Sequence, residues 1–286
     1  MTDRLPVVKT YKLFVGGGFV RSESGRHVPV ADVAGGHVAN APRGTRKDVR
    51  DAVRAARGAL PGWQGRTAYN RGQILYRFAE ALESRADELV IETSRMRGIP
   101  ADEARAEILA AVDTAVHYAG WTDKLGAVLG AVNPVAAPHF GFSMPEPSGV
   151  VGVLCPDEPD VLGLVAEILP PLAAGNVVVA VVSERWPLLS LHLGEVLGVA
   201  DVPAGVVNLL SGQRSELVPT LAGHRDVDGI VVAGVDDPEI VRLASDSVKR
   251  VARRGAVDYL DVAGLDGLTR MEPFIEVKTA WHPVGT

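Results

Sequence analysis

Residues 150–182 read VVGVLCPDEPDVLGLVAEILPPLAAGNVVVAVV, in which two apolar runs of strand length enclose a helical pattern. The most apolar part, Val161 to Val182, is interrupted by Glu167, by Pro170-Pro171 and by Gly175-Asn176. A membrane span requires about 20 continuous, predominantly apolar residues. We therefore predict a helix, a turn and a buried strand here, and no membrane partner.

The same alternation of strand and helix patterns continues toward the C-terminus. The predicted strands are Val150–Leu154, Val177–Val182, Val206–Leu210, Ile230–Ala233 and Lys249–Ala252. The predicted helices between and after them are Val161–Leu172, Leu188–Leu197, Glu216–Ala222 and Pro238–Val248. Short β and α units in alternation predict a parallel sheet with helices on both faces, joined by right-handed crossovers. The fold class is therefore α/β, a doubly wound Rossmann-like sheet, whose ligands bind at the carboxyl ends of the strands.

The N-terminal part carries hairpin and helix signals. Apolar residues alternate around the glycines of Lys12–Val20, as in a β-hairpin. Thr45-Arg-Lys-Asp48 has the side chains of a capping box, which predicts a helix start. Apolar residues then recur at helical spacing around residues 74–82 and 104–115. Residues 126–147 are almost uncharged, and we expect strands there that this chain or another covers.

Composition excludes several classes of function. The chain of 286 residues is 47% hydrophobic, which is typical of a folded globular protein. It has 29 basic and 35 acidic residues, for a net charge of -6, and no basic stripe, so we expect no nucleic-acid partner.

The single cysteine, Cys155, excludes an intrachain disulfide, and residues 1–12 lack the apolar core of a signal peptide. We therefore expect a cytoplasmic protein. No two of the seven histidines have metal-ligand spacing, so we predict no metal site.

Several segments, in order along the chain, resemble the aldehyde dehydrogenase superfamily. They are Leu13-Phe14-Val15-Gly16-Gly17, the Trp63…Arg71…Ile74-Leu75…Leu82-Glu83…Arg85…Glu88-Leu89 pattern, Tyr118-Ala119-Gly120-Trp121-Thr122-Asp123-Lys124, Glu146-Pro147-Ser148-Gly149-Val150-Val151-Gly152, Leu172-Ala173-Ala174-Gly175-Asn176-Val177-Val178-Val179, Pro203-Ala204-Gly205-Val206-Val207-Asn208 and Phe274-Ile275-Glu276-Val277-Lys278-Thr279-Ala280-Trp281. Each segment is a weak signal, but their shared order and spacing are specific.

The resemblance implies a division of the chain. Residues 1–125 and 148–254 correspond to the Rossmann-like, NAD-binding-type domain of the family. Residues 126–147 and 273–286 resemble the strands of its small β oligomerisation sheet. Residues 255–272 then form a bridge in the place of the catalytic lobe, which carries the nucleophilic cysteine in the family.

The catalytic groups that the resemblance implies are replaced. The family uses a thiolate nucleophile, an asparagine in the oxyanion hole and a general-base glutamate. Here Glu158 takes the place of the asparagine, and Arg253-Arg254-Gly255 stands where the glutamate is expected. Cys155 directly precedes Pro156 at a strand end, where we expect a buried structural cysteine. We therefore predict no catalytic residue and no activity of the chain by itself.

The cofactor site that the resemblance implies is also altered. Val181 takes the place of a ribose-binding lysine, while Glu184 retains the partner glutamate. Gly212 and Gly234 match glycines of the nucleotide-facing loops, but Asp236-Asp237 follows Gly234 and better fits a helix cap. The predicted cofactor-binding residues are thus Glu184, Gly212 and Gly234. We expect binding of NAD or NADP to be weak or lost.

Three functions remain open. The first is a non-catalytic subunit, or pseudoenzyme, that oligomerises with itself or with a full-length aldehyde dehydrogenase. The second is an NAD(P)-binding subunit of an aldehyde-oxidising oxidoreductase whose thiol comes from a partner chain. The third is a Rossmann module that binds a cation or amine at Asp157, Glu158 and Asp160, although a solvated, helix-capping turn is the simpler interpretation of these acids.

Overall fold

The computed structural model describes residues 8–255, 257–261 and 267–284, and its main body is built on a seven-stranded sheet in the order β11-β10-β7-β8-β9-β1-β2. The parallel strands are β7 (Val150–Leu154), β8 (Val177–Val181), β9 (Val207–Leu210), β10 (Gly229–Ala233) and β11 (Arg250–Arg254). The antiparallel hairpin β1 (Leu13–Val15) and β2 (Gly18–Val20) completes the sheet beside β9. The predicted doubly wound sheet and hairpin are confirmed.

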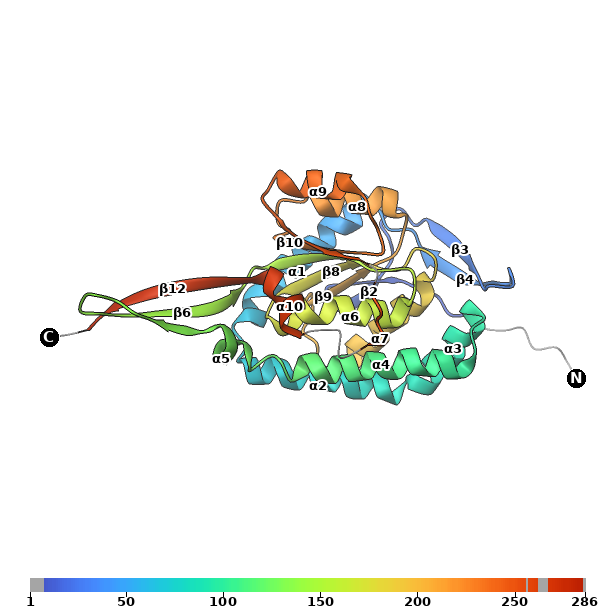
Figure 1. Ribbon diagram of the computed structural model, residues 1–286. Helices are drawn as coiled ribbons and strands as arrows, with labels where there is room; N and C mark the ends of the chain where they lie inside the picture. The colour runs from blue at the N-terminus through green and yellow to red at the C-terminus, as the bar shows by residue number, and fades with distance from the viewer. Residues whose placement is uncertain (1–7, 256, 262–266, 285–286) are drawn as a thin grey trace, which may run out of the picture.

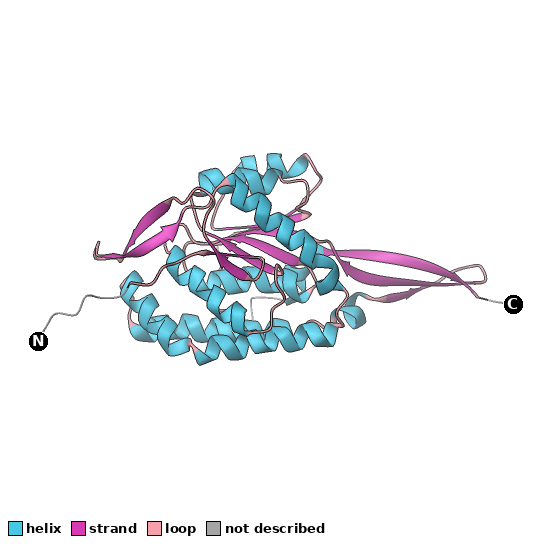
Figure 2. Ribbon diagram, turned by 180° about the vertical axis from the view of Figure 1, so that it is seen from behind, coloured by secondary structure: helices cyan, strands magenta, loops and turns pink. Residues whose placement is uncertain are grey.

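Helices cover both faces of this sheet (Figure 1, Figure 2). On one face lie α1 (Arg46–Gln64), α8 (Arg214–Gly223) and α9 (Pro238–Ser245). On the other face lie α6 (Asp160–Ala173) and α7 (Pro187–Val199), with α2 (Ala68–Ser84), α3 (Ala86–Arg97) and α4 (Ala101–Ala119) as an outer layer. All of α6 is buried because the sheet lies on one side of it and α4 on the other. Among the described residues, no helix is both long and apolar enough to cross a bilayer.

The predicted helix caps are confirmed. Thr45 and Asp48 form the reciprocal capping box of α1. Asp237 Oδ1 accepts the backbone N–H of Glu239 at 2.9 Å and so caps α9. The two-stranded sheet of β3 (His27–Ala31) and β4 (His37–Pro42) had no clear sequence signal.

A separate three-stranded sheet extends away from the body (Figure 1). Its strands are β5 (Ala131–Asn133), β6 (His139–Pro147) and β12 (Ile275–Pro283), in the order β12-β6-β5. We call these three strands the arm. Strands were expected from residue 126 onward, but the first four residues belong to helix α5 (Leu125–Leu129), which Leu125 anchors in the core.

The arm is fastened to the body by hydrogen bonds from the buried Asn176 and the half-buried Arg250. The amide of Asn176 accepts the N–H of Gly149 at 2.8 Å and donates to the carbonyl of Phe274 at 3.0 Å. Arg250 Nη1 donates to the carbonyl of Ile275 at 2.5 Å. The direction of the arm is therefore fixed at its base.

The bridge returns the chain from the end of β11 to the arm through α10 (Gly267–Met271) and the 3-10 helix η1 (Glu272–Phe274). It is held by Glu167 on α6, whose side chain is fully buried. Glu167 Oε1 accepts from Tyr259 Oη at 2.9 Å and from Arg270 Nη1 at 3.1 Å. Arg254 Nε donates to Glu167 Oε2 at 3.2 Å. The acid that interrupts the apolar run of α6 therefore binds the returning chain.

Candidate functional site at the strand ends

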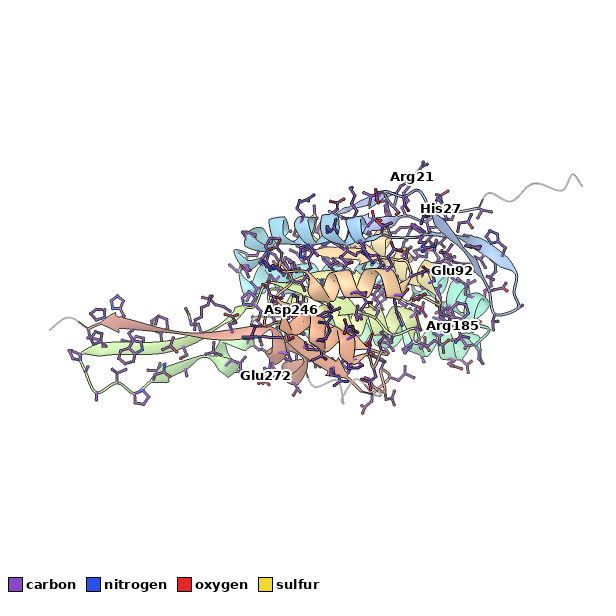
Figure 3. The ribbon with its side chains drawn as sticks, turned by 90° about the horizontal axis from the view of Figure 1, so that it is seen from above. Arg21, His27, Glu92, Arg185, Asp246 and Glu272 are labelled. Carbon is purple, nitrogen blue, oxygen red and sulfur yellow. The ribbon has the colours of Figure 1, made fainter. Side chains whose placement is uncertain are left out.

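The carboxyl ends of the parallel strands lie at the end of the body opposite to the arm. Arg185, which follows β8, lies at that end, whereas Glu272 lies where the arm leaves the body (Figure 3). We call residues 155–160, 182–186 and 211–214 the strand-end edge. They follow β7, β8 and β9, and Arg214 is the first residue of α8. Ligands of doubly wound sheets bind at such an edge.

Arg214 and Asp157 join the loops of this edge. Arg214 Nη2 donates to the carbonyl of Cys155 at 2.6 Å and to Asp157 Oδ1 at 3.0 Å, while Nη1 donates to Asp157 Oδ2 at 3.1 Å. Asp157 Oδ1 also accepts from Ser183 Oγ at 3.0 Å and from the N–H of Glu184 at 2.8 Å. A bidentate pair of this kind is strong and directional. It holds the ends of β7, β8 and β9 together.

The prediction of a solvated, helix-capping turn at Asp157, Glu158 and Asp160 is right about the exposure of Glu158 but wrong about the helix cap. The N-cap of α6 is Pro159, and no side chain caps the helix. Asp160 is fully buried and lies 3.3 Å from Arg97 Nη1, and burial raises the pKa of Asp160 to about 7 although Arg97 opposes this. Glu158 Oε1 accepts from Arg185 Nη1 at 2.8 Å and from Trp186 Nε1 at 3.0 Å. The turn is thus built on ion pairs with distant arginines.

The structure brings together two of the three predicted cofactor residues. Glu184 and Gly212 both line a cavity of about 230 Å³ between the strand-end edge and the β3–β4 hairpin. Glu184 Oε2 accepts the backbone N–H of Arg214 at 2.9 Å, so its carboxylate caps the start of α8. Gly234 lies after β10 on the other side of β7, and a Cβ there would lie 3.0 Å from the Cα of Pro156.

Cys155 and the arginines that replace the expected general base are in structural environments. Cys155 is fully buried, and burial raises the pKa of its thiol well above the usual value, so the thiolate is disfavoured. Arg254, where the resemblance implies an acid, is paired with Glu167, and Arg253 is paired with Asp236.

A cluster of ionisable side chains lies between α3 and α7, and the sequence analysis did not find it. His192 Nδ1 lies 2.8 Å from Glu92 Oε2, and Glu88 and Glu195 approach His192 Nε2 at 3.4 and 3.6 Å. Glu88, Glu92 and His192 have the geometry to hold a metal ion. Arg85 and Lys9 bind Glu195 at 2.5 and 2.7 Å, and Arg85 Nη1 lies 3.1 Å from His192 Nε2. These two cations supply positive charge to the cluster, so we assign no metal to it.

Comparisons with known proteins agree with this fold. The sequence model of the Aldehyde dehydrogenase family matches residues 19–253. A mitochondrial benzaldehyde dehydrogenase of Antirrhinum majus is 34% identical over 234 residues, which are 80% of this chain and 43% of the relative. Retinal dehydrogenase 2 of Homo sapiens is 32% identical over 85% of this chain and 47% of its own length. The NAD+ complex of an aldehyde dehydrogenase from Bacillus cereus superposes with a TM-score of 0.80 at 27% identity, over 86% of this chain and 50% of that one.

This chain therefore spans about half the length of the relatives it matches. The matched residues include β7 to β11 and the helices between them. The chain belongs to the aldehyde dehydrogenase family.

Proposed function

We propose that this chain is a non-catalytic subunit of the aldehyde dehydrogenase family that assembles through its arm, either with another copy of itself or with a full-length aldehyde dehydrogenase. The observation that carries the proposal is the arm: it projects from the body and exposes apolar side chains on both faces. Large exposed apolar patches mark interaction sites, because leaving them in water is unfavourable.

Each face of the arm carries its own apolar group. Residues that pair directly across antiparallel strands lie on the same face. Phe142 pairs with Ala280 and with Val132, and the rings of Phe140 and Phe142 lie 5.6 Å apart. Val132 and Phe140 are 70% and 46% exposed on this face. On the opposite face Trp281 is 64% exposed.

The outer strand offers a second means of association. β12 is a strand of nine residues at the edge of its sheet, and within the part of the chain that the structure describes it pairs with β6 alone. Beyond Ile275, whose carbonyl accepts from Arg250, its other side is open to another strand. Addition of a strand to such an edge is a common mode of protein recognition.

The strand-end edge supports a role without chemistry. The only cysteine of the sequence is buried with a raised pKa. Glu158 would repel the anion that an oxyanion hole stabilises. The single free cysteine also fits the cytoplasm, where we place the protein.

Two assays with the purified full chain test the proposal. Native mass spectrometry of the chain mixed with a full-length aldehyde dehydrogenase from the same source should show complexes of the chain with itself or with that enzyme. Incubation with acetaldehyde or benzaldehyde and NAD+ should produce no acid above the uncatalysed rate. Turnover by the isolated chain, or the absence of every complex, would contradict the proposal.

The alternative function is an NAD(P)-binding subunit that works with a partner's thiol. It is favoured by the shared cavity of Glu184 and Gly212 and by the bound NAD+ in the Bacillus cereus relative. Val181 is buried within β8 and offers no polar group to a ribose. Calorimetric titration with NAD+ and NADP+ separates the two functions, because only the alternative requires heat of binding.

A further inference from the structure

We infer that Arg214 closes the dinucleotide site of this chain, because its guanidinium occupies the part of the strand-end edge where a cofactor would lie. The inference deepens the proposed non-catalytic role by naming the residue that prevents cofactor binding. It rests on how poorly the residues of the strand-end edge fit the NAD+ that the Bacillus cereus relative binds.

The position of the site follows from the sheet. In doubly wound sheets a dinucleotide lies across the carboxyl ends of the strands and directs its phosphates at the N-terminus of a helix. In this chain the groups at that edge are the carbonyl of Cys155 after β7, the loop after β8 and the backbone N–H of Arg214 at the start of α8. Each of these groups has a partner from within the chain.

The guanidinium of Arg214 blocks the end of β7. It donates to the carbonyl of Cys155 and binds both carboxylate oxygens of Asp157. The side chain is only 16% exposed, so it lies in the edge rather than in solvent. A planar guanidinium that forms three hydrogen bonds is held rigidly.

The carboxylate of Glu184 occupies the N-terminus of α8. It accepts the backbone N–H of Arg214 at 2.9 Å, so this N–H is not free for an anion. A negative charge at a helix N-terminus is favourable, so this contact is stable. The amide that could bind an anion and the carboxylate that could bind a ribose hydroxyl therefore satisfy each other.

The cations of the edge are not available to a dinucleotide. Arg214 and Arg185 are already paired with Asp157 and Glu158, so neither guanidinium is free for a phosphate. Removing Arg214 alone would leave Asp157 unneutralised and repel phosphate. The informative variant is therefore Arg214→Gly combined with Asp157→Asn, which removes the guanidinium and the excess charge together.

The test is calorimetric titration of the full chain with NAD+. We expect the wild type to show no binding at 5 mM NAD+. The Arg214→Gly/Asp157→Asn variant should bind NAD+ with a dissociation constant at least tenfold below that concentration. Arg214→Lys/Asp157→Asn should remain closed, because lysine can still reach the Cys155 carbonyl. Arg185→Gly/Glu158→Gln, a matched loss of an ion pair from the same edge, should gain nothing.

Circular dichroism and thermal unfolding establish that each variant is folded. Saturation-transfer NMR of the wild type with adenosine provides a second measurement that needs no variant, and we expect no transfer at 5 mM. Binding of NAD+ or adenosine to the wild type, or no gain in the folded double variant, would overturn the inference. Native mass spectrometry measures assembly independently of cofactor binding. A wild type that assembles and also binds NAD+ contradicts only this inference. A wild type that stays monomeric, does not bind NAD+ and gains binding in the double variant contradicts only the proposed function.

Discussion

The strand-end edge and the arm lie at opposite ends of the molecule. They differ in whether their polar groups are paired and whether their apolar groups are buried. At the strand-end edge the acids are paired within the chain: Asp157 with Arg214, Glu158 with Arg185 and Asp160 with Arg97. On the arm, aromatic side chains face solvent and one side of β12 has no neighbour within the sheet. The carboxylates of the first region have cationic partners within the chain, whereas the second region leaves large apolar side chains exposed. The proposed role in assembly rests on the second region, and the proposed lack of catalysis rests on the first.

The largest effect should come from the bridge that connects the two regions. Glu167→Ala leaves the buried Arg270 and the largely buried Arg254 without their carboxylate. Breaking a buried ion pair from one side costs about 3–5 kcal/mol. We expect the free energy of unfolding, measured in guanidinium chloride, to fall by about this amount. Glu80→Ala, a change at an exposed position on α2, is the control. An equally small loss of unfolding free energy in both variants would show that Glu167 does not hold the bridge.

A charge on the exposed face of the arm should strongly weaken association. Phe140→Asp places a carboxylate beside Phe142, which an interface would have to desolvate. We expect the dissociation constant of the assembly to rise at least 100-fold, or about 2.7 kcal/mol, with little change in thermal midpoint. Analytical ultracentrifugation measures this shift. The control Ile91→Asp makes the same change at an exposed position on α3, and an equal shift there would assign the interface elsewhere.

The buried acid of the strand-end edge should give a pH dependence of stability. The folded-state pKa of Asp160 is about 7, above the value near 3.9 that an unfolded chain has. Between these two pKa values the native state therefore binds more protons than the unfolded state. The contribution of Asp160 to the free energy of unfolding is full below about pH 4 and is lost as the pH rises through 7. As the pH rises from 4.5 to 8, the free energy of unfolding of Asp160→Asn should increase relative to that of the wild type by at least about 1.4 kcal/mol, the equivalent of one pKa unit.

Chemical denaturation at a series of pH values measures this difference. Asp113→Asn, at an exposed position of α4, should show a constant difference from the wild type. A constant difference for Asp160→Asn as well would mean that its carboxyl group titrates as in solvent.

The smallest effect should come from the charged pair on the arm. Lys278 Nζ donates to Glu146 Oε2 at 2.5 Å, and both side chains are exposed. Exposed pairs contribute little because water and salt screen them. Lys278→Ala should leave the thermal midpoint unchanged in calorimetry at low and at high salt. A marked loss at low salt would show that this pair, rather than the apolar faces, organises the arm.

The fold could be predicted where a local pattern determines it. The valine-rich β7 and β8 are buried at every residue, and a buried parallel strand appears in sequence as an unbroken apolar run. The caps at Thr45 and Asp237 depend on residues two or three positions apart, so they too were visible. The helix α5 was missed because its five residues are too few for a periodic pattern.

The site was harder to predict because its contacts join distant residues. Arg214 binds Asp157 across 57 positions, and Arg97 reaches Asp160 across 63. The acids of residues 157–160 therefore appeared solvated when only their neighbours were considered. His192 lies 100 positions from Glu92, so no spacing rule could have connected them. The resemblance implied that Glu184, Gly212 and Gly234 bind a cofactor, but it could not show that Glu184 caps α8.

Sedimentation equilibrium of the purified chain at micromolar concentration, alone and mixed with a full-length aldehyde dehydrogenase from the same source, tests the central claim most directly. We predict a mass of at least two chains in one of the two samples. A mass of 30.2 kDa for this chain in both samples would show that the arm has no partner and would contradict the account.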